Sequence, residues 1–563
     1  VRAAAKRELE RRHGLLHPAE NAGHARRRNR TRHAQAQVNQ IALLESGREL
    51  LRGLRGVVRP LQMRQHRPPK FGEMRVGALA MEQEPAELFL QLLDRARQRR
   101  LRDVALLRRL GEVQRPAHGQ KITDLVHFHE AEITRYSRPA ATGPKMPRAE
   151  LLTLLAELER KVLWLASWTI HNANHLRDNE DGLKVGGHQA SSASLATIMT
   201  ALYFAVLRPQ DRVAVKPHAS PNFHAIQYLL GHQTLDKLQN FRGYKGAQSY
   251  PSRTKDVDDV DFSTGSVGLG VAQTLFSSLV QDYVHAHGWA KDKPEGRMVA
   301  LIGDAEMDEG NIFEALLEGW KHGVRNTWWI VDYNRQSLDA VIREGLWSRF
   351  ESMFRNFGWD VVILKYGSRL EAAFKEPGGE RLRAWIDACP NQLYSALTYQ
   401  GGAAWRKRLL DDIGDQGAVT KLIERHADAD LARLMTNLAG HDLPHLIDAF
   451  ERVDHDRPTC FIAYTIKGYG LPFAGHKDNH AGLMTPAQMQ GLREHMRIRE
   501  GREWDKFEGL SLPEETLTDF LGRVPFVREG RRRFTAPHID VPPALKVPIA
   551  GEMSTQAGFG NLM

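Results

Sequence analysis

The chain has very little cysteine and no long apolar run. Cys389 and Cys460 are its only cysteines, too few for a disulfide framework or a thiolate metal site. The longest apolar stretches, such as residues 327–331, fall far short of the ~20 residues that a membrane span requires. We therefore expect a protein of the reducing cytoplasm with no membrane partner.

Lysine and aromatic residues are scarce in the first quarter of the chain, where arginine dominates. Residues 1–145 contain 26 Arg and 4 Lys against 15 acidic residues, whereas the remainder holds 48 basic and 53 acidic residues. The net charge of +10 therefore comes entirely from this segment. Nucleic-acid-binding arms usually include aromatic side chains that stack on bases, so we expect no nucleic-acid partner. Two interpretations remain: a disordered basic tail, or sequence that is not native because translation was begun too early. We favour the second.

After residue 146, short apolar runs alternate with helical patterns. Residues 148–175 carry apolar side chains at three- and four-residue steps, which is typical of an amphipathic helix, and residues 189–207 predict another. Strands are expected at 213–215, 298–302, 328–331, 360–364 and 460–465, with helices at 311–322 and 347–357 and a mostly helical insertion at 378–450. This alternation predicts an α/β fold in which helices cover both faces of a parallel sheet.

Polar residues follow two of the predicted strands. Residues 303–311 read GDAEMDEGN after one strand, and residues 332–339 read DYNRQSLD after the next. Parallel strands present their carboxyl ends at one edge, where ligands bind. Asp304 and Asn334 would bring together two oxygen ligands of the kind that Mg²⁺ prefers, beside a helix N-terminus that suits a diphosphate. An acidic helix start would explain the first run alone, but the asparagine after the next strand favours a site.

This pattern resembles the thiamine diphosphate motif, which opens Gly-Asp-Gly and closes with Asn, and the separation of thirty positions between Asp304 and Asn334 matches it. The resemblance implies a thiamine-diphosphate-binding fold, with Mg²⁺ held by Asp304, the Asn334 side chain and the main-chain carbonyl of Gln336. Ala305 replaces the usual glycine, and its methyl group is tolerable if the backbone dihedrals are ordinary. The implied cofactor-binding residues are Gly303, Asp304, Ala305, Glu306, Asn334, Ser266 and Gly268.

Further motifs extend the resemblance over about residues 160–484. The runs GGHQAS, HASP, SYP, GSVGLG and TIKGYG begin at residues 186, 218, 249, 265 and 465. In content and order they are similar to the homodimeric decarboxylating component of the pyruvate dehydrogenase complex. The resemblance implies decarboxylation of a 2-oxo acid, pyruvate, and transfer of the acetyl group to a lipoyl acyltransferase.

The same resemblance assigns three catalytic histidines. His188 and His218 match histidines near the thiazolium ring and the diphosphate, where imidazole can hydrogen-bond or move protons near neutral pH. His480 matches a histidine that helps to bind the 2-oxo acid, with His476 as the competing candidate. Lys216 and Pro217 stand where the relatives carry Gln-Gly, a departure that concerns substrate contacts rather than cofactor binding.

Four segments are expected along the chain: a disordered or non-native segment at 1–145, the cofactor domain at 146–500, an extended linker at 501–545, and the start of a pyrimidine-binding domain at 546–563. In the family, the glutamate that activates the cofactor lies in that last domain and acts across a dimer interface. We therefore expect the chain to be a fragment or one half of a split enzyme, inactive alone, that needs a homodimer or a pyrimidine-domain partner.

Two other functions fit part of the pattern. A transketolase shares the cofactor machinery but transfers a ketol group between sugar phosphates, so comparing pyruvate with a ketose phosphate separates the two. A non-enzymatic remnant that binds a full-length subunit would instead co-purify with a pyrimidine-domain protein.

The change of composition at Met146 makes this residue the expected natural start. Mass spectrometry of the native protein should find no peptides that precede Met146. Abundant peptides from residues 1–145 would contradict this expectation.

Overall fold

The computed structural model describes residues 146–178, 182, 184–337, 340–415, 417–527, 532, 540 and 551–562. The predictions for residues 1–145, and those for most of 528–550, lie outside these described residues. Within the described part of the chain, no helix is both long and apolar enough to cross a membrane.

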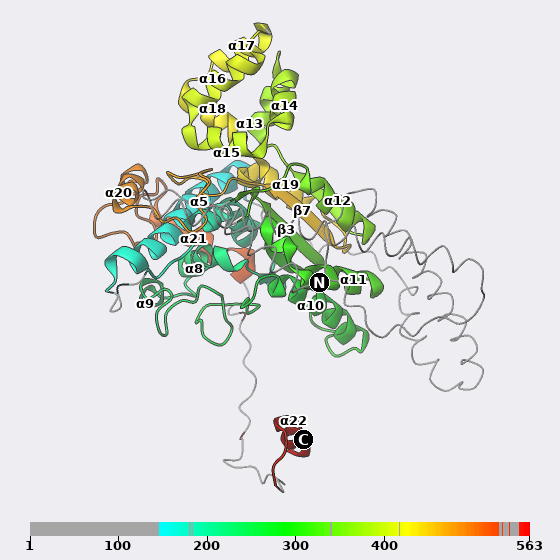
Figure 1. The fold of residues 1–563 in the computed structure, drawn as a ribbon. Helices are drawn as coiled ribbons and strands as arrows, with labels where there is room; N and C mark the ends of the chain where they lie inside the picture. The colour runs from blue at the N-terminus through cyan, green and yellow to red at the C-terminus, as the bar shows by residue number, and fades with distance from the viewer. Residues whose placement is uncertain are drawn as a thin grey trace, which may run out of the picture. The chain divides into compact units, whose positions relative to one another are not determined.

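A five-stranded parallel sheet lies at the centre of the described residues (Figure 1), with the order β1-β2-β3-β7-β6. All four neighbouring pairs run parallel. The strands are β1 (Arg212–Ala214), β2 (Met298–Gly303), β3 (Thr327–Tyr333), β6 (Asp360–Leu364) and β7 (Thr459–Tyr464). Every predicted strand forms within two residues of its expected bounds, so the α/β, parallel-sheet prediction is confirmed.

Alternate residues of the inner strands supply two separate cores. On β2, Val299 and Leu301 belong to one core, whereas Ala300 and Ile302 belong to the other. The first core is covered by α5 (Arg148–His171), α7 (Ala196–Ala201), α8 (Ser220–Leu229) and α19 (Leu443–Glu451). The second is covered by α10 (Leu269–Ala286), α11 (Gly310–Lys321) and α12 (Leu346–Asn356). Burial on both faces explains why these strands read as continuous apolar runs.

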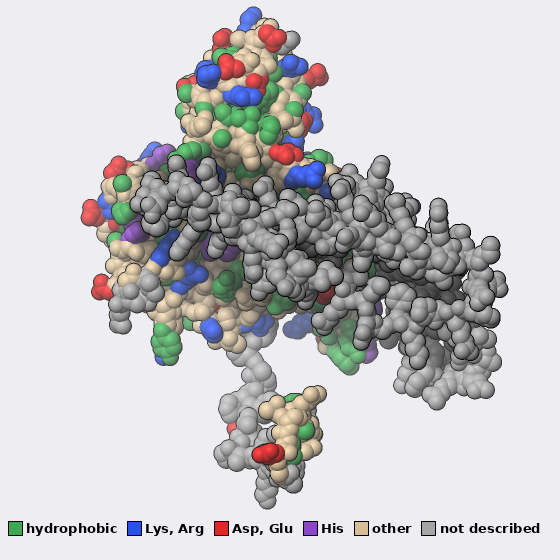
Figure 2. Space-filling view, in the orientation of Figure 1, with side chains coloured by type: hydrophobic (Ala, Val, Ile, Leu, Met, Phe, Trp, Pro, Cys, Tyr) green, Lys and Arg blue, Asp and Glu red, His purple; other side chains and the backbone are tan. Residues whose placement is uncertain are grey.

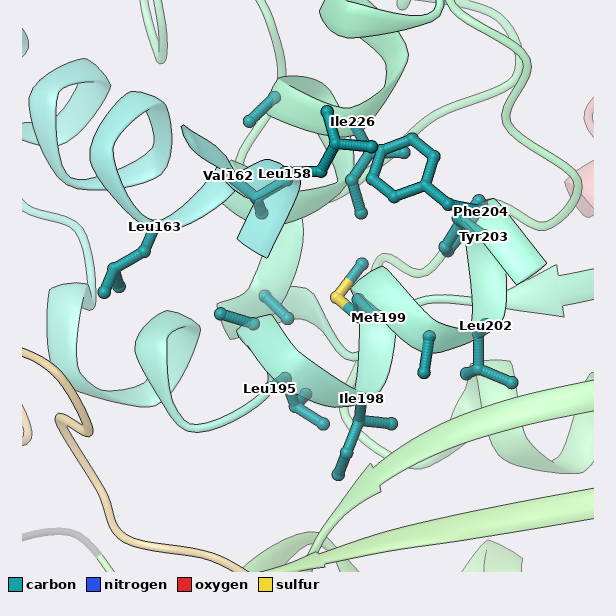
Figure 3. Close-up of a cluster of buried hydrophobic side chains, with 14 of the residues drawn as sticks. Leu158, Val162, Leu163, Leu195, Ile198, Met199, Leu202, Tyr203, Phe204 and Ile226 are labelled. Atoms are coloured by element: carbon teal, nitrogen blue, oxygen red, sulfur yellow. The ribbon is translucent and has the colours of Figure 1, made fainter. Parts of the chain in front are cut away.

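Figure 3 shows part of the first core, where Leu158 and Val162 of α5 lie with Ile226 of α8 and side chains from residues 195–204. The single helix predicted for residues 189–207 is divided into α6 (Gln189–Ala193), α7 and the π-helix η5 (Leu202–Val206). The break falls at Ser194, whose hydroxyl donates to Asp332 at 2.6 Å and whose Oγ also lies 3.0 Å from the Ser191 carbonyl oxygen. A serine that bonds in this way competes with the regular helix ladder.

The predicted helical insertion lies between β6 and β7 and forms its own lobe (Figure 1). It contains α13 (Ser368–Phe374), α14 (Gly379–Ala388), α15 (Asn391–Gln400), α16 (Gly402–Ile413), α17 (Gly417–Glu424) and α18 (Asp428–Met435). Trp405 is fully buried there, against the ring of Tyr394 at 5.2 Å. Acidic and basic side chains alternate over the surface of this lobe (Figure 2).

Short elements complete the described chain. They are η4 (Asn172–Leu176), η6 (Pro217–Ala219), α9 (Leu235–Gln239), η7 (Asp304–Asp308), β4 (Gln336–Ser337), β5 (Ala340–Val341), η8 (Ala439–His441), α20 (Pro486–His495), α21 (Glu514–Gly522), η9 (Pro525–Val527) and α22 (Thr555–Leu562).

The segment predicted as an extended linker, 501–545, differs from that expectation over its first half. Leu517 of α21 and Phe526 of η9 are buried in the first core, and the Phe526 ring meets the Tyr203 ring edge-on at 5.1 Å. Upstream of α21, the Glu503 carbonyl accepts a hydrogen bond from the Trp164 indole at 2.8 Å. Residues 503–527 therefore pack as part of the domain. The sequence did not reveal this apolar face because charges and prolines are scattered through the segment.

Substituting Leu517 tests this packing. Leu517→Ala should lower the free energy of unfolding by about 2–5 kcal/mol, since a fully buried leucine is lost and a cavity remains. Urea unfolding followed by circular dichroism measures the change. Thr518→Ala, at the next and exposed position of α21, is the matched control and should shift it by less than about 0.5 kcal/mol. Equal effects at both positions would show that α21 does not contribute to the core.

Candidate functional site

Polar residues from four neighbouring strands meet at the carboxyl edge of the sheet. Lys216 follows β1, Asp304 follows β2, and Thr465 follows β7, while Asp332 is the penultimate residue of β3. The register pairs Gly303 with Asp332, which aligns the ends of β2 and β3. All of these side chains are buried.

The Asp332 carboxylate is the centre of this network. Lys216 Nζ donates to its Oδ2 at 2.9 Å, and Ser194 Oγ donates to the same oxygen at 2.6 Å. Thr465 Oγ1 donates to the other oxygen. Burial opposes both charges, but the ammonium and these hydrogen bonds hold the pKa of Asp332 below its ordinary value, and the carboxylate raises the pKa of Lys216. The pair is therefore a buried ion pair rather than two neutral groups.

The structure brings the two predicted magnesium ligands to the same place. Asp304 Oδ2 accepts a hydrogen bond at 2.7 Å from the main-chain N–H of Arg335, the residue after Asn334. Two hydrogen bonds orient the Asn334 side-chain amide. Its Nδ2 donates to Asp332 at 3.2 Å, and its Oδ1 accepts from the Gln336 N–H at 3.0 Å. A carboxylate and an amide oxygen on adjacent strand ends are hard donors that fit Mg²⁺.

Without a cation beside it, the ionised form of Asp304 is disfavoured. Burial, and then the neighbouring Asp332 carboxylate, raise the pKa of Asp304 to about 7. A divalent ion would favour the ionised form. The role predicted for the Gln336 carbonyl stays a prediction; Gln336 itself is buried at the start of β4.

Arg335 holds a strained backbone position in this site. Its φ of 65° is in the left-handed region, which costs a non-glycine residue about 1–2 kcal/mol. Its N–H bonds Asp304, and its guanidinium donates to the Thr465 carbonyl at 3.1 Å and lies 4.4 Å from the centre of the Tyr394 ring. These contacts offset the strain and fix the peptide that joins Asn334 to Arg335.

Glu306 ties the glycine loop to the strand end. Its Oε1 accepts from the Gly268 N–H at 2.8 Å and its Oε2 from the Gly303 N–H at 3.1 Å. Gly268 has a φ of +81°, and a Cβ there would lie 2.6 Å from Asn311 Oδ1, so a glycine is required. Ser266 is exposed on the same loop.

Ala305 is accommodated without strain. Among the described residues, the non-glycine positions with positive φ are Arg242, Lys245, Asn326, Arg335 and Arg497, so Ala305 has an ordinary backbone. Gly303 is more constrained, because a Cβ there would meet Lys216 Nζ at 3.1 Å.

The three predicted histidines gather in one cluster. The His188 and His218 rings stack at 3.9 Å, and His480 lies 5.0 and 5.4 Å from them. Lys467 Nζ lies 3.0 Å from His480 Nδ1. Burial, followed by the neighbouring charges, lowers the pKa of His188 to about 4 and that of His218 to about 2, so both are neutral at pH 7. His476, the alternative to His480, packs instead against the Tyr399 ring at 4.7 Å.

Sequence reasoning did not assign Lys216, Asp332 or Arg335 to the site. Asp332 did carry a signal, because an acidic residue near the end of an apolar strand must find a partner when that strand is buried. Lys216 was noted only as a departure at substrate contacts, whereas the structure places its ammonium against Asp332. Arg335 carried no signal, since the partner of its guanidinium lies 130 positions away in the sequence.

Comparisons with known proteins find one family model and several similar proteins. The family described as transketolase, thiamine diphosphate binding domain, matches residues 184–376. The pyruvate dehydrogenase E1 component of Cupriavidus necator is 29% identical over 351 residues, covering 60% of this chain and 38% of that protein. The E1 component of Escherichia coli K12 is 28% identical over 360 residues, covering 61% and 39%. The transketolase of Campylobacter jejuni aligns in three dimensions with a TM-score of 0.44 at 18% identity, covering 67% of this chain and 47% of that one. The chain thus spans about two fifths of the curated relatives that it matches.

The buried ion pair can be tested without any ligand. Lys216→Met leaves Asp332 buried without its cation and should lower the free energy of unfolding by about 3–5 kcal/mol. Lys321→Met removes an ammonium that pairs with Glu318 at the surface and should cost under about 1 kcal/mol. Urea unfolding of both variants compares them. Similar losses would contradict the central position given to the Lys216–Asp332 pair.

Proposed function

We propose that this chain is a member of the transketolase-like superfamily of thiamine diphosphate enzymes. In this proposal, Asp304 and Asn334 hold a Mg²⁺ ion, which anchors the diphosphate of the cofactor. The Gln336 carbonyl is proposed as a third ligand. The observation that carries the proposal is the hydrogen bond from the Arg335 N–H to Asp304 at 2.7 Å, which joins the ends of β2 and β3.

The surrounding residues are proposed to shape the cofactor pocket. Glu306 keeps the loop of Ser266 and Gly268 beside Gly303. Main-chain N–H groups at this edge suit the phosphate oxygens. When bound, the cofactor supplies an electron sink for cleavage next to a carbonyl group.

The histidine cluster is proposed to handle the substrate. His188 and His218 are neutral at pH 7, so each can donate one N–H and accept at the other ring nitrogen. His480 contacts Lys467 at the edge of this cluster of rings, and the two residues are proposed to offer polar groups to the carboxylate of a 2-oxo acid. Proton transfer to and from the substrate oxygen is the chemistry that these rings can perform.

The proposed overall reaction is decarboxylation of pyruvate, with the acetyl group passed to a lipoyl acyltransferase. It is supported by similarity to E1 components at 28–29% identity over 60–61% of the chain. The assembled enzyme, loaded with thiamine diphosphate and Mg²⁺, should accept pyruvate and reject a ketose phosphate. Preference for the ketose phosphate would favour a transketolase activity instead.

Calorimetry tests the metal site directly. Asp304→Ala should weaken Mg²⁺-dependent binding of thiamine diphosphate by at least about 100-fold. This loss of affinity is larger than that typical of substitutions at residues that contact the metal ligands but not the metal. Asp308→Ala, exposed at the other end of η7, is the matched control and should bind as the unmodified chain does. Equal affinity in the Asp304 variant would remove the proposed anchor.

A further inference from the structure

A cavity lies beside Arg335. It has a volume of about 80 Å³ and is lined by residues from the ends of β3 and β7, from the start of α12 and from α14 and α15. Arg335, Tyr464, Lys365, Cys389 and Asn391 are among its lining residues. A buried water needs about 10–15 Å³ of such space, so the cavity has room for a small ion but not for a nucleotide.

Arg335 gives this cavity an unsatisfied positive charge. The residue is 8% exposed, and its Nε has no hydrogen-bond partner. Within the described residues its guanidinium is paired with a carbonyl and two aromatic rings, and with no carboxylate. Burying an unpaired charge is costly, so the site favours an incoming anion.

Among the described residues, no other charged group that lines the cavity forms an ion pair with Arg335. Lys365 is paired with Asp387, and its ammonium lies 5.6 Å from the Tyr464 ring, on which Arg335 also lies at 5.8 Å. Glu344 is the remaining acid, and its carboxylate accepts from the Asn391 N–H at 3.3 Å. Glu344 thus balances Arg335 in formal charge, but it forms no ion pair with the guanidinium in the described part of the chain, so N–H groups of Arg335 are left for an incoming anion.

We propose that this cavity is a binding site for a small oxyanion, a carboxylate or a phosphate, held by the Arg335 guanidinium. Guanidinium groups bind both anions through paired N–H donors. Asp304 receives the main-chain N–H of the same residue. An anion that moves Arg335 therefore also changes the position of this N–H, and it couples to the proposed cofactor site. Anion binding does not depend on the proposed function, whereas the coupling does.

Titration calorimetry with oxalate and with inorganic phosphate tests the proposal, using the full chain loaded with thiamine diphosphate and Mg²⁺ so that the diphosphate position is filled. Arg335→Met removes the guanidinium, and Cys389→Phe fills the cavity while it leaves Arg335 intact. Arg355→Met, whose exposed side chain pairs with Glu351 on α12, is the control. We expect saturable binding that weakens by about tenfold or more in the first two variants and is unchanged in the third.

The outcomes separate the anion sources and the two proposals. Binding of oxalate alone identifies a planar carboxylate as the ligand, and binding of phosphate alone identifies a tetrahedral anion. If Arg335→Met fails to fold, Cys389→Phe decides. Absence of binding for both anions, or binding that Cys389→Phe leaves unchanged, overturns the cavity proposal. Coupling between the two sites appears as a change in cofactor affinity when oxalate is added. This change should be absent in the Cys389→Phe variant. Failure of the cofactor itself to bind overturns the proposed function, and the titrations are then made on the unloaded chain.

Discussion

The carboxyl edge of the sheet depends on one buried ion pair, that of Lys216 and Asp332. A carboxylate that is fully buried near the end of β3 is tolerable only because an ammonium from the neighbouring β1 segment and two hydroxyl groups surround it. The same carboxylate orients the Asn334 amide. Removal of the Asp332 carboxylate would leave the polar residues that follow β1, β3 and β7 without a common hydrogen-bond partner.

The ion pair also affects how the oxygen atoms of the site are presented. Its bonds draw polar groups down to the sheet, so Asp304 and Asn334 present oxygen atoms at the edge instead of satisfying one another. The Asp304 oxygens accept main-chain N–H groups only. The protein thus holds two hard oxygen donors in place before any ion arrives, an arrangement that lowers the cost of binding.

The sequence predicted the sheet and the polar strand ends because both follow from local patterns. Apolar runs of three to six residues are visible without tertiary information, and Asp304 and Asn334 follow two of them within three positions. The roles of Lys216 and Arg335 could not be predicted, since each depends on a partner more than one hundred residues away. The prediction for residues 503–527 was wrong for a related reason: Leu517 and Phe526 are apolar residues in a polar setting. Only their packing in the first core, which includes the contact of Phe526 with Tyr203 of η5, reveals their burial.

The strand order has a consequence for how the domain is assembled. Among the described strands, β6 pairs only with β7, and β7 also pairs with β3. The whole helical lobe separates β6 from β7 along the chain. During synthesis β6 must therefore wait, unpaired, until β7 emerges and inserts between two strands made earlier. Such late, non-local pairing slows folding and exposes an apolar strand in the meantime, so compaction of the lobe before β7 appears would shorten the interval in which the nascent chain can aggregate.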